Sequence, residues 1–228
     1  MKLYAFWRSA SSWRVRLALG LKGIPYDYVS VDFGKGAGEQ HDDSHRARNP
    51  MEQVPVLEWE EGGRAVRIAQ SIAIIEYLEE LHPTPRLLPE SLLARARARQ
   101  LAEVVNSGVQ PLGAPTVTGF FKATTGGDPK AWTVHWITRG LRALEILSKD
   151  SAGRYLVGDQ ITVADLCLVP QMFGARANGI DLAPYPTLVR IDAECMKHEV
   201  FLASVPDKQP DAPGAVKPAP KTDTAPQC

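Results

Sequence analysis

A cluster of serines near the start of the chain separates a short apolar segment from an amphipathic one. Residues 2–6 have the apolar composition of a buried strand. After the serines, Val15, Ala18 and Leu19 recur at the three- and four-residue spacing of a helix. The first N–H groups of a helix have no intrahelical partner, and the helix dipole adds about half a positive charge there. The sequence therefore predicts a strand-to-helix turn that can hold an anion.

The stretch at this turn is Arg8-Ser9-Ala10-Ser11-Ser12-Trp13-Arg14. A serine at the start of a helix most often caps it by accepting a hydrogen bond from the backbone of the first turn. Capping needs no ligand, whereas a hydroxyl that donates a hydrogen bond to a bound anion stabilises its charge. The stretch alone leaves both interpretations open.

A second pattern, over residues 49–78, predicts the order of the elements. Val54-Pro55 precedes a strand, the two glycines at 62–63 favour a hairpin turn because they tolerate positive φ, and Gln70-Ser71 begins a helix. The predicted order is strand, helix, strand, loop, hairpin, helix. The Val-Pro and Gln-Ser pairs, together with the serine stretch, resemble the glutathione-binding, thioredoxin-like domain of the cytosolic glutathione transferases.

Motifs further along the chain make the resemblance more specific. They are Pro83-Thr84-Pro85-Arg86-Leu87-Leu88-Pro89, Gln110-Pro111-Leu112, the segment from Gly158 to Gln171 and Pro184-Tyr185-Pro186-Thr187. With these motifs in order, residues 2–210 resemble a zeta-class transferase, the family of maleylacetoacetate and maleylpyruvate isomerases. Within them, Thr162 and Asp165 match a capping box, which we interpret as structural.

The resemblance implies the cytosolic glutathione transferase fold, which combines an α/β domain with an all-α domain. A thioredoxin-like glutathione-binding domain is expected at residues 1–84 and an all-helical domain at 89–208. Residues 209–228 are rich in Pro, Ala, Lys and Asp and almost lack large apolar side chains. Such a segment cannot offset the entropy of ordering, so a disordered tail is predicted there.

Composition argues against several function classes. Lys and Arg together number 26, as do Asp and Glu, so the formal net charge is zero, which disfavours a general binder of nucleic acid or anionic membranes. No apolar run approaches the roughly 18 residues of a membrane span. The three cysteines form no Cys-x-x-Cys pair and the five histidines are scattered, so no metal site is expected. These features predict a cytoplasmic protein.

The resemblance implies glutathione as cofactor, and its thiol must be activated. A free thiol has a pKa of about 8.5, so only a small fraction is thiolate at neutral pH. Ser9 matches the first serine of the family's Arg-Ser-Ser-Cys string, to which the thiolate-stabilising role is assigned. This chain departs from that string, with Ala10 at the second serine and Ser11 at the cysteine. Ser11 is therefore an alternative partner for the sulfur, and Arg14 is expected to add positive potential.

The other glutathione contacts follow from the needs of a tripeptide. Val54, held before a proline, offers extended backbone groups to the cysteinyl backbone, and the resemblance implies a cis bond to Pro55. Gln70 and Ser71, at a helix start, suit the γ-glutamyl carboxylate. Gln40 corresponds to a family glutamine near the other end of glutathione. Gln110 is expected at the edge of the second domain.

The implied reaction is cis–trans isomerisation of a conjugated diacid, in which glutathione is not consumed, with transferase activity as a side reaction. A dicarboxylate substrate needs a cation at each end. Arg8 flanks the thiol, and Arg176 comes from the helical domain. Many family members carry two adjacent arginines there, whereas here Ala177 follows. A surface ion pair is the alternative interpretation of each arginine.

Three functions remain open at this point. The first is maleylacetoacetate isomerase of phenylalanine and tyrosine breakdown, and the second is maleylpyruvate isomerase of gentisate breakdown, whose substrate has a shorter keto arm. The third is a glutathione-binding protein with little isomerase activity, because the serine string is altered. The resemblance also implies a homodimer, consistent with a helix over 92–105 that is apolar on one side.

Overall fold

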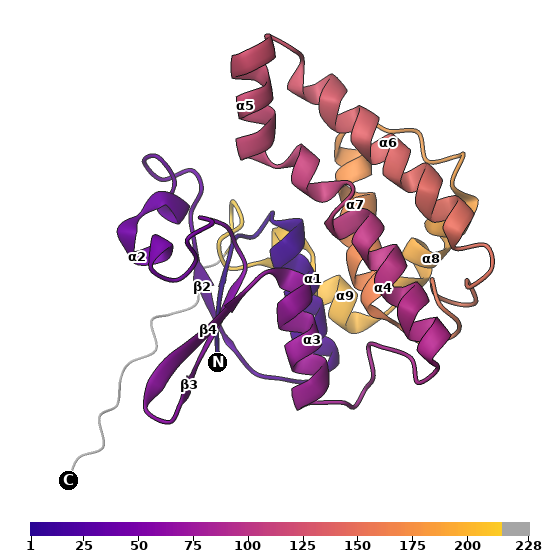
Figure 1. Cartoon of the computed structure of the whole chain (residues 1–228), viewed down its shortest axis with the longest axis horizontal. Coiled ribbons are helices and arrows are strands. Elements are labelled where there is room, and N and C mark those ends of the chain that lie inside the picture. The colour runs from indigo at the N-terminus through magenta and orange to yellow at the C-terminus, as the bar shows by residue number, and fades with distance from the viewer. Residues whose placement is uncertain (216–228) are drawn as a thin grey trace.

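The computed structural model of the chain describes residues 1–215, which form a small sheet with its helices followed by a larger group of helices. Figure 1 shows the sheet at one end of the molecule and the helical part at the other, with α1 (Ala10–Leu21) and α3 (Ser71–Leu81) between them. No helix in the described part of the chain is long and apolar enough to cross a membrane.

The first part has four strands in the order β2-β1-β3-β4. They are β1 (Lys2–Ala5), β2 (Asp27–Ser30), β3 (Val56–Glu61) and β4 (Arg64–Ala69), and the short η1 (Glu39–His41) and α2 (Asp43–Arg46) lie between β2 and β3. Strand β1 is parallel to β2 and antiparallel to β3, which is antiparallel to β4. The order strand, helix, strand, loop, hairpin, helix is thus confirmed.

Successive side chains of a strand point to opposite faces of the sheet, so those of β1 pack alternately into two cores. Leu3 and Ala5 are fully buried in the main core, on the side of α1 and α3. Tyr4 joins Val54 and Val56 in a smaller cluster. The sheet is therefore packed on both sides near the end of β1.

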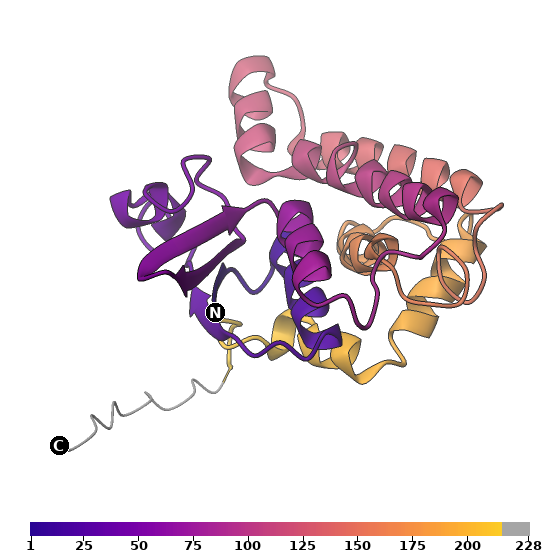
Figure 2. The same cartoon turned by 60° about the horizontal axis from the view of Figure 1, so that its bottom comes forward.

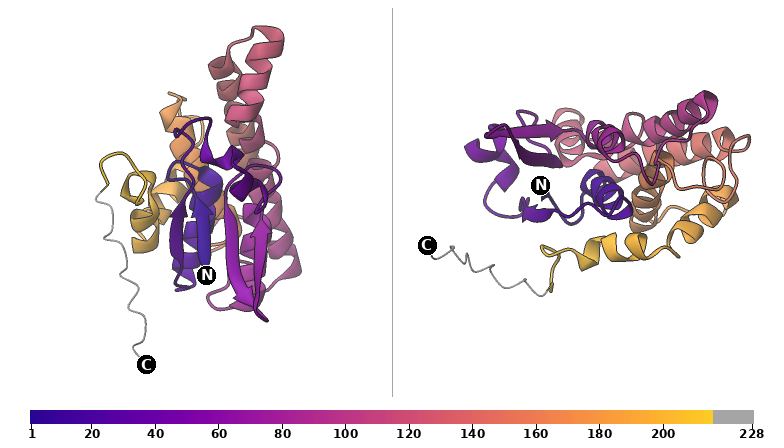
Figure 3. Two further views of the ribbon diagram at one scale, coloured as in Figure 1. Left: turned by 90° about the vertical axis from the view of Figure 1, so that its left-hand side faces the viewer. Right: turned by 90° about the horizontal axis from the view of Figure 1, so that it is seen from below.

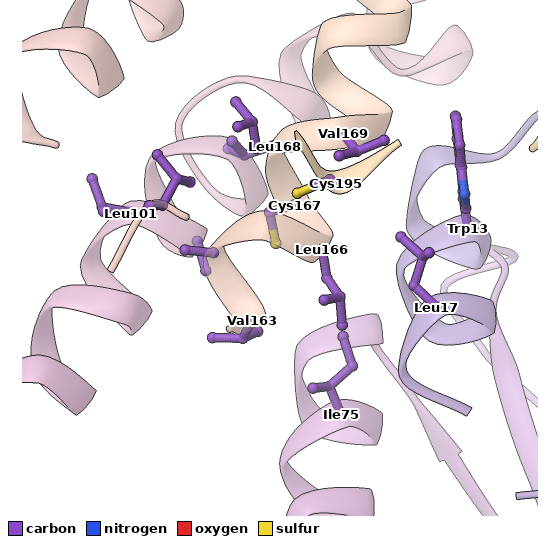
Figure 4. Close-up of a cluster of buried hydrophobic side chains, with 14 of the residues drawn as sticks. Trp13, Leu17, Ile75, Leu101, Val163, Leu166, Cys167, Leu168, Val169 and Cys195 are labelled. Atoms are coloured by element: carbon purple, nitrogen blue, oxygen red, sulfur yellow. The ribbon is translucent and has the colours of Figure 1, made fainter. Parts of the chain in front are cut away.

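The helical part is built around α7 (Val163–Ala177), which is buried along most of its length. Figure 4 shows side chains of α1, α3 and α4 converging on it. The other elements are α4 (Leu92–Asn106), η2 (Gln110–Gly113), α5 (Pro115–Thr125), α6 (Pro129–Leu147), α8 (Pro186–Cys195), α9 (Glu199–Ser204) and η3 (Pro206–Lys208). Figure 2 shows α4 and α6 side by side along one face of this part. Because α7 packs on α1, the two parts share one core.

Local sequence signals are found where the residues predicted them. Gly62 and Gly63 both have positive φ, 58° and 74°, in the β3–β4 hairpin. The Val54-Pro55 bond is cis. Thr162 and Asp165 form a capping box at the start of α7, and the buried Asp165 carboxylate also accepts the Leu156 N–H at 2.9 Å. The capping box is therefore structural, as predicted.

The predicted disordered tail at 209–228 is wrong for its first residues. Gln209 and Ala212 are buried, and Asp211 accepts hydrogen bonds from the N-terminal part. Polar contacts hold this segment in place of the apolar burial that its composition lacks. The remainder of the tail, residues 216–228, lies outside the described residues.

Candidate active site

Three chain segments meet at one end of the sheet. The register pairs Tyr4 with Val56 and Val56 with Ala69, so β1 and β4 end where β3 begins. The residues just beyond these strand ends are Ser9, Val54, Gln70 and Ser71. Sheet topology thus gathers four of the predicted site residues at a single edge.

Ser9 is the N-cap of α1, and its hydroxyl remains able to donate. Its Oγ accepts a hydrogen bond from the Ser12 N–H at 3.2 Å, and its own N–H donates to the Phe6 carbonyl at 3.0 Å. Within residues 1–215, the hydroxyl donates its hydrogen to no other group. Capping uses only the oxygen, so the same side chain can also donate to an anion.

Ser11 is engaged on both its donor and its acceptor side. Its hydroxyl donates to Gln110 Oε1 at 3.1 Å and accepts from Arg14 Nη2 at 3.1 Å. The contact with Gln110 joins α1 to η2 of the helical part. Because its hydrogen is already used, Ser11 is the weaker candidate for donating to a ligand sulfur.

Arg14 carries a buried positive charge next to this turn. Arg14 is 1% exposed, and its Nη1 donates to Asn106 Oδ1 at 2.7 Å and lies 3.7 Å from the Cys167 sulfur. It forms no salt bridge with any carboxylate in the part of the chain that the structure describes. Asn106 in turn donates to Glu103 at 3.2 Å. The positive potential of Arg14 is therefore only indirectly compensated.

Asn106 was missed by sequence reasoning. It lies 92 residues from Arg14, at the end of α4, and a lone asparagine in a helix gives no signal of such a contact.

Val54 presents backbone groups without a partner. Val54 is only 9% exposed, yet across residues 1–215 no group hydrogen-bonds to its N–H or C=O. Pairing of β3 with β1 begins only at Val56. An extended peptide can add to such a segment as a further short strand.

Gln70 and Ser71 form a helix start in a rare backbone conformation. Gln70 has φ 71° and ψ 114°, although it is not glycine. Such strain clusters at ligand sites. Ser71 is the buried first residue of α3, where free N–H groups favour an anion. This corner therefore suits a carboxylate.

Gln40 lies in η1, across the loop from Val54. The neighbouring residue, His41, contacts Glu52, which places η1 beside the segment before Val54. The Oε1 atom of Gln40 is buried and accepts no hydrogen bond within the described chain. An unsatisfied buried amide oxygen is unusual and fits a ligand donor.

The two arginines predicted to bind the substrate differ in their exposure and their contacts. Arg8 is exposed beside Ser9. Arg176, near the end of α7, donates to Asp192 Oδ2 at 2.5 Å, so the ion-pair alternative is observed for it. Asp192 is 5% exposed by side chain, and burial raises the pKa of its carboxyl, an effect that Arg176 opposes. Arg176 still has 49% of its side chain exposed.

The predicted site residues are placed as follows. Hydrogen bonds join Ser11, Arg14 and Gln110 into one cluster, and Ser9, Val54, Gln70 and Ser71 lie at one edge of the sheet. Gln40 and Arg8 border these groups, and Arg176 is bound elsewhere. Among residues 1–215, no group of three or more His, Cys, Asp or Glu is placed to hold a metal ion.

Comparison with known proteins agrees with this geometry. Residues 3–86 match the glutathione S-transferase N-terminal domain. The chain is 46% identical to a probable maleylacetoacetate isomerase of Drosophila melanogaster, with 92% of this chain and 90% of that protein covered. It is 44% identical to a maleylpyruvate isomerase of a Ralstonia species, with 93% of this chain and 100% of that protein covered.

A solved structure extends the similarity. The maleylacetoacetate isomerase of Anaeromyxobacter dehalogenans, with glutathione bound in its active site, superposes with a TM-score of 0.86 at 52% identity, covering 93% of this chain and 97% of that one. Another structure of that enzyme contains dicarboxyethyl glutathione and citrate in the active site, with a TM-score of 0.85, 51% identity and the same coverage of 93% and 97%.

Proposed function

The chain belongs to the zeta-class glutathione transferases, the family of maleylacetoacetate and maleylpyruvate isomerases, and from that membership we propose that it converts maleylacetoacetate into fumarylacetoacetate in phenylalanine and tyrosine breakdown. It is a glutathione-dependent cis–trans isomerase. The observation that carries the proposal is the free hydroxyl hydrogen of Ser9 at the start of α1.

The residues at the sheet edge fit glutathione. The unpaired backbone of Val54 suits the cysteinyl backbone, and the N-terminus of α3 at Gln70 and Ser71 suits the γ-glutamyl carboxylate. Gln40 offers an unsatisfied amide oxygen toward the other end. Bound glutathione supplies a thiolate that adds to the cis double bond of the substrate and leaves once the former double bond has rotated.

The chain's own groups favour the charged form of that thiol. Ser9 donates a hydrogen bond to sulfur, the first turn of α1 contributes its dipole, and Arg14 adds a buried cation without a salt bridge. Each unit by which the thiol pKa falls corresponds to about 1.4 kcal/mol of preference for the thiolate. A hydroxyl hydrogen bond and a helix terminus together supply about one or two such units.

Two arginines are available for a substrate with two carboxylates. Arg8 is exposed next to Ser9 and suits the carboxylate nearer the thiol. Arg176 uses Nη2 for Asp192 and keeps nearly half of its side chain exposed, so its other guanidinium nitrogens suit the remote carboxylate.

Maleylpyruvate is the alternative substrate, supported by the 44% identity to the Ralstonia enzyme. Purified protein assayed on both maleyl compounds, with and without glutathione, tests the proposal. We expect turnover that requires glutathione and a higher kcat/KM for maleylacetoacetate. A preference for maleylpyruvate selects the alternative, and glutathione binding without turnover of either compound contradicts an isomerase function.

The assignment of the thiolate partner predicts different effects of two serine substitutions. Ser9→Ala should lower kcat about ten- to a hundred-fold, the value of a hydrogen bond to a charged group, and raise the pKa of the bound glutathione thiol. The dissociation constant of glutathione should change little, because the tripeptide ends bind elsewhere. Ser11→Ala, the matched control, should leave the thiol pKa near its original value. The reverse pattern would show that Ser11 is the partner of the sulfur.

Substitution of Arg176 separates its two roles. Arg176→Ala should raise the KM for a maleyl diacid about ten-fold or more, the value of a lost charge-assisted hydrogen bond, with glutathione affinity unchanged. Asp192→Asn removes the ion pair but keeps the guanidinium, so it should leave that KM unchanged. Steady-state kinetics on both variants, with thermal melting as a stability control, distinguishes a substrate contact of Arg176 from a purely structural ion pair. An unchanged KM in Arg176→Ala, accompanied only by a lower melting temperature, would assign Arg176 to the ion pair alone.

We further propose that the protein is a homodimer in which the first part of one protomer packs on the helical part of the other. Met51, in the loop before β3, is 63% exposed, and Leu92 and Leu93, at the start of α4, are 85% and 69% exposed. Light scattering should give the mass of two chains. Leu93→Glu should shift the mass toward one chain, whereas Ile146→Glu, at a site 59% exposed on α6, should not.

A further inference from the structure

The backbone of Trp7, two residues before Ser9, is bound by ionisable side chains at both its N–H and its carbonyl, which belong to two successive peptide groups. Its N–H donates to Asp211 Oδ2 at 3.0 Å, and its carbonyl accepts from Arg16 Nη2 at 3.2 Å. Asp211 lies 204 residues further along the chain. The turn that carries Ser9 is therefore fixed by the C-terminal segment.

The burial of the Arg16 guanidinium is energetically costly. Arg16 is 2% exposed, and burial lowers the pKa of its guanidinium. Its Nε and Nη1 atoms have no hydrogen-bond partner within residues 1–215, and neither does Oδ1 of Asp211. Burying charges with incomplete hydrogen bonding rarely adds stability. Stability alone is thus a poor explanation of this arrangement.

The C-terminal segment reaches Trp7 along α1. The indole N–H of Trp13 donates to Ser204 Oγ at 2.8 Å, and Arg16 Nη2 also donates to the Ser204 carbonyl at 3.1 Å. Beyond η3, Asp211 accepts a second hydrogen bond, from the Ser30 hydroxyl at the end of β2, at 3.1 Å. Figure 3 shows this segment running beside α1 back toward the sheet.

Hydrogen bonds link the Phe6–Trp7 peptide group to Ser9. The N–H of Ser9 donates at 3.0 Å to the Phe6 carbonyl, which belongs to the same peptide group as the Trp7 N–H. The Phe6 N–H lies 3.5 Å from Ser12 Oγ, and the Ser12 N–H donates to Ser9 Oγ. These hydrogen bonds connect the Phe6–Trp7 peptide group to Ser9 and Ser12, so we expect a shift of that peptide group to displace the Ser9 hydroxyl.

We propose that Asp211 is a positioning residue for Ser9, which it aims at the thiol of bound glutathione by holding the Phe6–Trp7 peptide group in place. Arg16 holds the next peptide group through the Trp7 carbonyl. The proposal rests on the function proposed above, because it assigns Ser9 to the sulfur.

Three substitutions in the full chain test it. Asp211→Ala removes the acceptor for the Trp7 N–H, Asp211→Asn keeps an acceptor oxygen, and Asp207→Ala is a matched control at an exposed position of η3. The measurements are the pKa of the bound glutathione thiol, the glutathione dissociation constant, kcat, and amide hydrogen exchange at residues 6–9 without glutathione.

We expect Asp211→Ala to raise the thiol pKa and to lower kcat about ten-fold, with the dissociation constant within about three-fold of the original, because a mispositioned hydroxyl affects sulfur charge more than tripeptide binding. Amide exchange at residues 6–9 should accelerate in this variant. Asp211→Asn should keep most of the original thiol pKa and kcat, and Asp207→Ala should change neither.

The proposal is overturned if Asp211→Ala melts at a lower temperature but retains the original thiol pKa, since Asp211 then only stabilises the fold. It is also overturned if Asp211→Asn is as impaired as Asp211→Ala, since charge and not the hydrogen bond to Trp7 is then what matters. Failure of the isomerase function is distinguishable, because the thiol pKa and the amide exchange are measured without any maleyl substrate.

Discussion

The hydrogen bond from the Ser12 N–H to Ser9 Oγ is the constraint on which the rest of the site depends. It uses the oxygen of the hydroxyl and orients the side chain, while the hydrogen remains free. It also fixes the start of α1 at the end of β1, where Val54 and the N-terminus of α3 are brought by the register of the sheet. One capping interaction therefore both ends the turn and leaves the hydroxyl hydrogen of Ser9 free, as its proposed role toward a thiolate requires.

The helical part and the C-terminal segment contribute side chains that bind the turn before α1 and the first residues of α1. Gln110 binds Ser11, Asn106 and Cys167 contact Arg14, and Asp211 holds Trp7. These contacts come from η2, α4, α7 and the C-terminal segment. Because one core also runs through α1 and α7, the first part does not present a finished site without the second.

Local signals were predictable from sequence, and long-range partners were not. The hairpin glycines and the capping box at Thr162 each depend on a few neighbouring residues. The resemblance implied the cis Val54-Pro55 bond, which the structure contains, and identified the cytosolic glutathione transferase fold, which the similarities confirm. The pairing of Arg176 with Asp192 and the hydrogen bond of Asp211 to Trp7 have no local signature. The composition of residues 209–215 predicted disorder, but a few polar contacts order this segment without an apolar core.

The buried positive charge of Arg14 has no full countercharge beside it, and this favours an anion at the turn. A buried guanidinium without a salt bridge leaves part of its desolvation cost uncompensated. Asn106 and the Ser11 hydroxyl satisfy two of its nitrogens with neutral dipoles, which supply less than a full countercharge. Under the proposed function, a thiolate at the start of α1 would supply the missing countercharge, so the burial of Arg14 would favour the charged form of the bound thiol. Replacement of Arg14 by a neutral side chain is then expected to remove both the desolvation cost and this preference.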